Sequence, residues 1–224
     1  MTPEYPTQKT PPRKETFANQ TARLAIRDDG RWPLAEHYLI HTRRLPDDLV
    51  RSLYVHGDLY PSFSQLYPQS TGICFVHRNL EGEPRGATIR GATQGPSSSF
   101  SIGEKAGAWF RLGDPNRANR AILVESPIDA ISYAAMKRPD QAVVLSMSCA
   151  SVFRSILQTA HERRWPLAVG FDNDPAGNAG WERCQEDQRL LYPNDPPACR
   201  IVPGAKDWNA DLCAAARRSH KRSL

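Results

Sequence analysis

The sequence has no long apolar stretch. Nothing in its 224 residues approaches the run of about twenty apolar residues that a membrane-spanning helix needs. Residues 1–20 are polar and lack the apolar core of a secretory signal peptide. From these absences we expect a cytoplasmic protein without a membrane partner.

Cysteine is scarce and irregularly placed. The five cysteines are odd in number and scattered, and no two of them stand in a CxxC spacing. This pattern argues against both a disulfide framework and a cysteine-based zinc site. We expect reduced thiols in the interior.

The charge balance is mildly positive. Lysine and arginine number 29 against 24 acidic residues, which gives a formal net charge of +5. Such an excess suits a polyanionic partner, although many proteins of other functions share it.

The first half of the chain changes character twice. Residues 1–20 are rich in proline, threonine and lysine without apolar periodicity, which predicts a disordered tail. Residues 21–116 combine two short helical patterns, at 34–44 and from Pro46 to Gly57, with β-rich runs separated by glycine, proline and serine. These features predict a small α+β domain, whose expected strands are 72–77, 87–90 and 108–112.

The second half alternates strands and helices. Continuous apolar runs predict strands, and each is followed by a helical pattern: strands at 121–124, 142–146, 166–171 and 199–202, helices at 128–136, 152–161, 179–191 and 208–217. Uninterrupted apolar strands are typical of a parallel sheet covered on both faces. We therefore expect an α/β domain over residues 117–216, a parallel sheet flanked by helices, and a basic tail over 217–224.

Acidic residues follow two of these strands. Glu125 comes directly after 121–124, and Asp129 opens the next helix. Asp172 and Asp174 follow strand 166–171. Ligands of open parallel sheets bind at the carboxyl ends of the strands, and converging carboxylates call for a hard cation such as Mg²⁺. Taken singly, Asp129 also fits a helix N-terminal acid, and the aspartates of DNDPAG also fit a turn.

The acidic segments resemble a known family. ESPIDA (125–130) and GFDNDPAG (170–177) look like the two motifs of Toprim domains, and KDWN (206–209) resembles a third region of the primase-like Toprim subgroup. The upstream segments RRLPDDLVRSLYVHGDLYPS, GICFVHRN and GEPRGATIRG are similar to the domain that precedes Toprim in many plasmid and integrative-element proteins. The resemblance covers about residues 33–216 and implies a primase-like Toprim fold.

The resemblance also implies roles for individual residues. Glu125 would act as a general acid/base or a metal-linked carboxylate, and Asp129 would support the catalytic site. Asp172 and Asp174 would join Glu125 in holding Mg²⁺, with Mn²⁺ as a substitute. Lys206 and Asp207 would line the same cleft.

The sequence departs from the family pattern in two respects. Ser126 stands where many Toprim proteins have glycine, which leaves the geometry of this turn open. The chain also has no zinc-ribbon domain, so we expect template recognition to depend on another chain or another surface.

Basic residues before the Toprim-like part are candidates for contacts with nucleic acid. The family comparison suggests that this region lines a groove for a template strand, and phosphates are bound by lysine and arginine. The candidates are Arg85, Arg90, Lys105 and Arg111. A solvated face is the alternative for each one alone, and Trp109 and Phe110 are expected in the core.

Three functions remain open from sequence alone. The first is a primase-like nucleotidyltransferase that uses single-stranded DNA and nucleoside triphosphates, with a helicase, relaxase or other replication protein as a possible partner. The second is a Toprim nuclease with a water nucleophile. The third is a nucleic-acid-binding module without catalysis. The upstream segments favour the first over the second.

Overall fold

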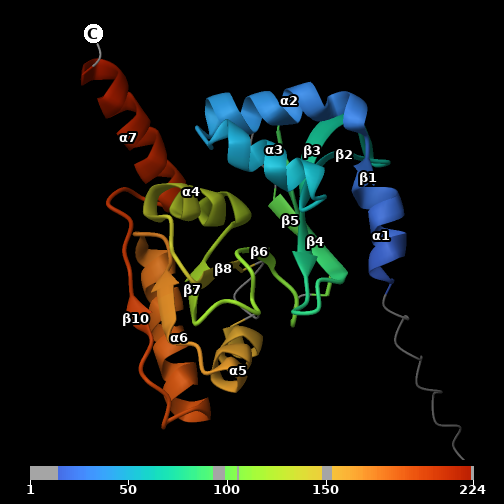
Figure 1. The fold of residues 1–224 in the computed structure, drawn as a ribbon. Helices are drawn as coiled ribbons and strands as arrows, with labels where there is room; N and C mark the ends of the chain where they lie inside the picture. Colours follow the sequence, from blue (N-terminus) through green and yellow to red (C-terminus); the bar gives the residue numbers. More distant parts are fainter. Residues whose placement is uncertain (1–14, 93–98, 105, 148–152, 223–224) are drawn as a thin grey trace, which may run out of the picture.

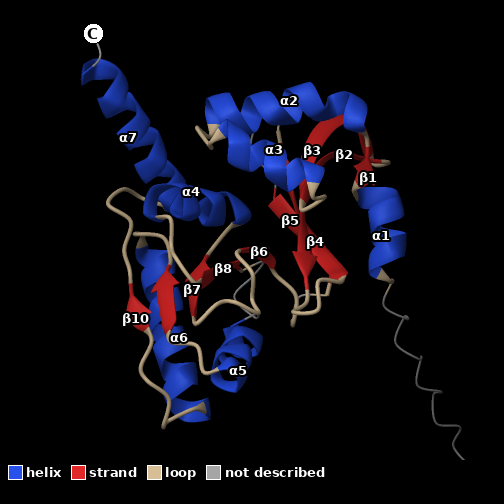
Figure 2. Cartoon of the chain, in the orientation of Figure 1, coloured by secondary structure: helices blue, strands red, loops and turns tan. Residues whose placement is uncertain are grey.

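A computed structural model describes residues 15–92, 99–104, 106–147 and 153–222. Within these ranges the chain forms two five-stranded sheets, one from each half of the sequence (Figures 1 and 2). Lys105, one of the basic candidates, and Cys149 lie outside the described residues.

The first sheet is antiparallel and has the order β1-β2-β3-β4-β5. Its strands are β1 (Ile26–Arg27), β2 (Leu59–Ser64), β3 (Tyr67–Arg78), β4 (Pro84–Gly91) and β5 (Ser99–Gly103). Alternating residues of β3 divide the core: Ile73 and Phe75 face one hydrophobic cluster, whereas Cys74 and Val76 face another. The sheet is thus covered on both faces, and the predicted α+β character is confirmed.

Helices cover the two faces of this sheet. Helix α1 (Phe17–Leu24) packs Phe17 and Leu24 against the Cys74 face. The other face carries α2 (Trp32–His37), η2 (Tyr38–Thr42) and α3 (Asp47–Val55), and η1 (Asp29–Arg31) directly precedes α2 (Figure 1). Pro46 is the N-cap residue of α3, and Gly57, at φ 71°, follows its end.

Helix α1 corrects the prediction of a disordered tail over residues 1–20. The helix begins at Phe17, and the Thr16 side chain accepts a hydrogen bond from the amide of Asn19 at 3.3 Å. A segment with so few apolar residues gives a weak helical pattern. Its helix is stabilised by tertiary packing rather than by its own sequence.

The second sheet has the order β10-β9-β7-β8-β6. Strands β7 (Arg120–Val124), β8 (Ala142–Ser146), β9 (Leu167–Gly170) and β10 (Cys199–Arg200) are parallel, as predicted. Strand β6 (Phe110–Leu112) pairs with β8 in the antiparallel direction. The prediction had assigned these residues to the first domain, so the second sheet crosses the predicted boundary at 116/117. The pattern of apolar residues around β6 does not indicate this pairing, because its partner β8 is distant in the sequence.

Four helices flank the second sheet. Helices α4 (Pro127–Lys137) and α7 (Trp208–Arg222) pack on the face that also meets the first domain. Helices α5 (Phe153–Arg163) and α6 (Pro175–Leu191) pack on the other face. Helix α7 extends away from the body of the molecule to Arg222, so the predicted basic tail over 217–224 is helical for most of its length (Figure 1).

Only some of the described cysteines lie in the interior, where all of them were expected. The four described cysteines are unpaired; Cys74 and Cys184 are buried, whereas Cys199 is exposed against expectation. Among the described residues, no helix combines the length and apolar character that crossing a bilayer requires.

Candidate active site

The acidic residues meet at the carboxyl edge of the second sheet. Strands β7 and β9 are parallel neighbours whose last residues, Val124 and Gly170, stand opposite each other. Glu125 and Asp172 therefore emerge side by side, and the Asp172 amide donates a hydrogen bond to Glu125 Oε1 at 3.1 Å. The predicted adjacency of these two residues is confirmed.

The loop after β9 places Asp174 at the start of α6. Asp174 is the N-cap residue, and its Oδ1 accepts a hydrogen bond from the Gly177 amide at 2.9 Å. Gly177 is required here because a Cβ atom at this position would collide with the carbonyl oxygen of Asp172. Asp174 therefore has the turn role that the sequence also allowed. Its second oxygen, Oδ2, remains at the acidic edge and lies 3.7 Å from Lys206 Nζ.

The loop before α7 is tied to the loop after β9. The Asn173 amide donates to the Lys206 carbonyl at 2.7 Å. The indole of Trp208 donates to the Gly170 carbonyl at 2.7 Å, at a point where a side chain on residue 170 would press on the ring. Asp207 Oδ1 accepts from the Ala210 amide at 2.6 Å. These contacts bring Lys206 and Asp207 to the acids at the end of β9.

Asp129 lies below this edge and is buried, with 7% of its surface exposed. Its Oδ2 accepts a hydrogen bond from Ser126 Oγ at 2.5 Å, and its Oδ1 accepts from the Asn209 amide at 3.3 Å. Ser126 is the N-cap residue of α4, which gives this departure from the family pattern a structural purpose. With both oxygens engaged inside the protein, Asp129 is placed to position the two helices rather than to touch a substrate.

Asn209 is a residue whose contribution the sequence reasoning missed, although the KDWN segment contained it. Its side-chain amide donates to the carbonyl of Arg43 at 2.7 Å and to Ser132 Oγ at 3.0 Å. Its backbone amide holds Asp129. Asn209 thus connects the end of η2 in the first domain to the base of the acidic cluster.

Burial and repulsion between neighbouring carboxylates raise the pKa values of Glu125, Asp129 and Asp172. Burial is the largest cause that raises the pKa of Asp172 to about 7, and repulsion from Glu125 follows. Burial also raises the pKa of Glu125, assisted by repulsion from Asp174 and Asp207 and opposed by the Asp172 amide and Lys206. The pKa of Asp129 rises to about 6, mainly through burial. The cluster therefore holds more negative charge than its surroundings compensate.

One buried oxygen at this edge is left without a partner. Asp172 Oδ1 has no hydrogen-bond donor in the structure. Within the described residues, no three His, Cys, Asp or Glu side chains already stand in an arrangement that holds a metal ion. Mg²⁺ commonly uses one or two carboxylates and completes its shell with water and phosphate oxygens, so the orphaned oxygen and the crowded charges fit such an ion.

The predicted basic residues lie at two places. Arg85, at the start of β4, is exposed and pairs with Glu83 at 2.6 Å and Glu104 at 3.8 Å. Glu83 also accepts from the Asn79 side chain, and the Asn79 carbonyl accepts from Arg111 on β6, so Arg85 and Arg111 border the same turn. Arg90 lies near the other end of β4, opposite Ile73 and Ser99.

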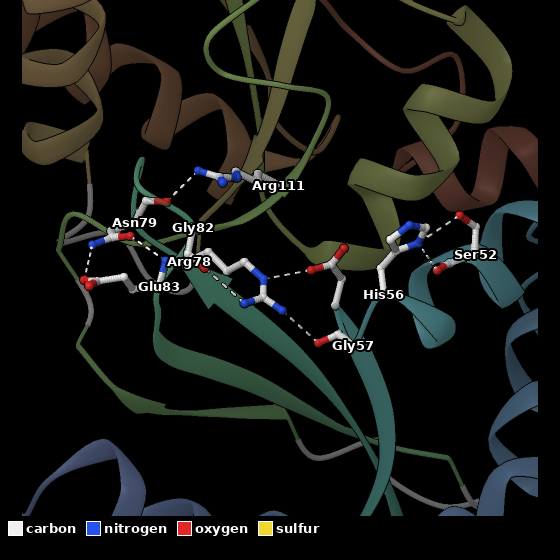
Figure 3. Close-up of polar contacts among 9 residues, drawn as sticks. Ser52, His56, Gly57, Arg78, Asn79, Gly82, Glu83 and Arg111 are labelled. Carbon is white, nitrogen blue, oxygen red and sulfur yellow. Dashed lines mark hydrogen bonds and ion pairs between the residues drawn. The ribbon is translucent and has the colours of Figure 1, made fainter.

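Arg111 belongs to a polar network at the junction of the domains, drawn in Figure 3. Its guanidinium donates to the Asn79 carbonyl at 2.5 Å, and burial, followed by repulsion from Arg78, lowers its pKa. Arg78 donates to Asp58 at 2.8 Å and to the carbonyls of Gly82 and Gly57 at 3.1 and 3.2 Å. These arginines satisfy carbonyl groups between the sheets, which is a structural role. Trp109 and Phe110 are buried, as expected.

Two family models match separate parts of the chain. A model described as Toprim-like matches residues 122–212, and a model described as protein of unknown function (DUF3991) matches residues 37–118. A sequence comparison with curated proteins finds no match.

Solved structures with a similar fold are primase catalytic cores. The primase fragment of the bacteriophage T7 primase-helicase protein aligns at a TM-score of 0.55 and 16% identity, covering 81% of this chain and 72% of that one. The DnaG catalytic core aligns at 0.58 and 16% identity, covering 85% and 72%. The DnaG primase catalytic domain bound to ssDNA aligns at 0.56 and 16% identity, covering 84% and 70%. The chain therefore carries a Toprim-like domain preceded by a DUF3991 domain, and it is a primase-like Toprim protein in fold.

Proposed function

We propose that this protein is a Mg²⁺-dependent, primase-like nucleotidyltransferase that synthesises primers on single-stranded DNA from nucleoside triphosphates. The observation that carries the proposal is the carboxyl-edge cluster, in which Asp172 Oδ1 is buried without a partner beside Glu125. Carboxylates whose negative charge is not balanced by neighbouring basic groups favour the binding of a cation. The fold similarity to primase cores supports nucleic acid as the substrate.

Each acidic residue has a distinct part in this proposal. Asp172 and Asp174 would hold the ion, with Glu125 as a third, metal-linked carboxylate. Bound Mg²⁺ would neutralise charge on the reacting phosphate. Glu125 Oε1 is engaged with the Asp172 amide, so Oε2 is the atom that would accept the proton of the attacking hydroxyl. The raised pKa of Glu125 makes this carboxylate a better proton acceptor than an ordinary glutamate.

The remaining residues of the edge orient the site. Lys206 is exposed beside Asp174 and is placed to meet a phosphate oxygen once the aspartate turns to the ion. Asp207 holds the first turn of α7, and Asp129 fixes α4 against Asn209. These contacts keep the acids in place, because helices are more rigid supports than loops.

Partner proteins follow from the resemblance rather than from the site. We propose that the protein acts on a plasmid or integrative element together with a helicase, relaxase or other replication protein. The T7 relative is described as part of a primase-helicase protein, which supports this choice.

The proposal is tested by incubating the purified protein with labelled nucleoside triphosphates, single-stranded DNA and Mg²⁺ or Mn²⁺. Both synthesis and cleavage are resolved on the same gel. Metal-dependent nucleotide incorporation supports the proposal. Cleavage without incorporation supports a Toprim nuclease that uses the same acids with a water nucleophile. Tight binding of single strands without either reaction identifies a non-catalytic module.

A further inference from the structure

A second concave site lies on the outer face of the first sheet, the face that α1 covers in part. Helix α1 ends at Leu24 and leaves one end of this face uncovered. There a cavity of about 360 Å³ is bounded by the β2–β3 hairpin, β4 and β5. Its volume lies in the range of small-ligand sites. Nothing in the acidic edge described above uses it.

The inner wall of this cavity contains a row of small residues. Ser62, Gly72 and Gly91 stand opposite one another on β2, β3 and β4 and form one cross-strand row. At Gly72 the Ile89 and Ser62 side chains lie where a larger residue would place its Cβ, and both residues line the cavity. The next row, which includes Tyr60 and Cys74, lies in the core beside α1.

Aromatic rings and hydroxyl groups border the cavity. Tyr67 and Phe100 both line it, and they are exposed by 69% and 41%, which is unusual for large apolar side chains. Four hydroxyl-bearing residues complete the polar part of the lining: Ser62, Ser64, Ser70 and Thr71. Among the lining residues there is no carboxylate.

Two further observations point to a ligand with hydrogen-bonding groups. Ser62 is fully buried, lines the cavity, and its Oγ has no hydrogen-bond partner in the structure. The guanidinium of Arg31 lies 4.7 Å from the centre of the Phe63 ring and donates to the Ser70 carbonyl at 3.0 Å. Arg31 thereby fixes the hairpin wall, while its charge is paired with Asp28 at 2.8 Å. An apolar peptide side chain would leave Ser62 unsatisfied.

We propose that this cavity binds one unpaired base of a single-stranded nucleic acid, stacked on Tyr67 and Phe100 and hydrogen-bonded to Ser62. Every base offers a π-face to aromatic side chains and polar edges to hydroxyl groups. The absence of lining carboxylates suits the phosphates on either side of the base. The choice of nucleic acid rests on the proposed function. The site would hold the strand at a distance from the acidic edge of the second sheet and so give the template a second anchor.

The test compares two strands of equal length and charge, oligo-deoxythymidine and an abasic sugar-phosphate strand, by fluorescence anisotropy in EDTA. The test variant is Tyr67→Ala with Phe100→Ala. The control is Leu66→Ala, which removes a neighbouring side chain that is 62% exposed and does not line the cavity. Ser62→Ala supplies a second variant that removes only the hydroxyl.

We expect the wild type and Leu66→Ala to prefer the base-containing strand, and the double variant to lose about tenfold or more of its affinity for that strand alone. The slope of affinity against salt stays unchanged, because no phosphate contact is removed. Amide signals of Gly72 and Gly91 should shift in NMR spectra with the base-containing strand only. Equal binding of both strands by the wild type, or an equal loss for both strands in the double variant, would overturn the proposal.

Failure of this inference is separable from failure of the proposed function. The binding measurement contains no metal and no nucleoside triphosphate, so an inactive protein still reports on the base site. Conversely, a protein that synthesises primers without discriminating the abasic strand retains its function and lacks the base site. If the cavity instead binds a protein partner, the wild type binds the base-containing and the abasic strand equally in the binding assay.

Discussion

Burial disfavours the charged form of one group in each sheet, with opposite shifts in pKa. In the first sheet, His77 is 1% exposed and hydrogen bonds with Thr88 Oγ1 at 2.9 Å, and burial lowers its pKa to about 4. At the carboxyl edge of the second sheet, burial raises the pKa of Asp172 to about 7. The histidine is left neutral and satisfied. The acid is left near the border of ionisation, with one oxygen unpartnered.

The difference shows what each sheet is organised to do. A neutral, hydrogen-bonded group inside a sheet stabilises the fold at neutral pH. A crowded set of partly buried acids costs stability in the metal-free protein and is compensated only when a cation binds. At this point the first sheet holds a neutral group that stabilises it, whereas the crowded acids at the edge of the second sheet are the observation behind the proposed cation site.

The largest effect is expected from Glu125→Gln. This change keeps the shape of the side chain and the acceptor for the Asp172 amide but removes the group that takes the proton. We expect phosphoryl transfer to fall by about 10²–10⁴-fold while the fold and DNA binding persist. The comparison variant is Glu186→Gln on the exposed side of α6, which should retain full activity. Equal activity of both variants would remove Glu125 from the mechanism.

The second effect concerns the backbone that carries the edge. Gly177→Ala places a Cβ atom against the carbonyl of Asp172, so the loop must shift. We expect the free energy of unfolding in urea to fall by about 1–3 kcal/mol, the usual cost of overpacking. Ala176→Ser, at the exposed neighbouring position, should cost much less. If the two variants unfold at the same urea concentration, the close packing of this loop is not what holds Asp172 in place.

A third, smaller effect is a pair of opposite pH dependences in the metal-free protein. The folded pKa of Asp172 is raised, so its contribution to stability is present below about pH 4 and is lost as the pH rises toward 7. The folded pKa of His77 is lowered, so its contribution is present above about pH 6.5 and is lost as the pH falls toward 4.

Urea unfolding at several pH values between 4 and 8 separates these contributions. The stability of Asp172→Asn relative to wild type should grow as the pH rises through this range. The loss caused by His77→Gln should shrink as the pH falls. Asp140→Asn, at an exposed acid outside the cluster, serves as the control and should follow the wild type. If the free energies of unfolding of Asp172→Asn and wild type changed with pH in parallel, the raised pKa of Asp172 would be contradicted.

The sequence predicted the second sheet better than the first. Strand β8 has the predicted bounds 142–146, and β7 and α4 differ by one residue at the ends. Long apolar runs between helical patterns specify such elements locally. By contrast, β2 and β5 were not predicted. Pro61 and the serines of these strands are residues typical of turns, and only pairing with distant strands makes them extended.

The residues of the candidate site also differ in how far the sequence predicted their positions. The acids after β7 and β9 were predictable because strand ends in a parallel sheet share one edge. The placement of Lys206 and Asp207 came from the family resemblance, since no local rule connects them to residue 173. The surroundings of Arg111 were not predictable, because its partner Asn79 belongs to the first domain and the contact depends on how the two sheets pack.

The most direct test of the central claim is the effect of Mg²⁺ on thermal unfolding of the wild type and Asp172→Asn at pH 8. In EDTA, Asp172→Asn should melt at the same temperature as the wild type or higher, because one of several crowded charges is gone. With Mg²⁺ the order should reverse, because only the wild type retains the full set of ligands and gains stability from binding. Equal Mg²⁺-induced shifts in the two proteins, or no shift in either, would contradict the account.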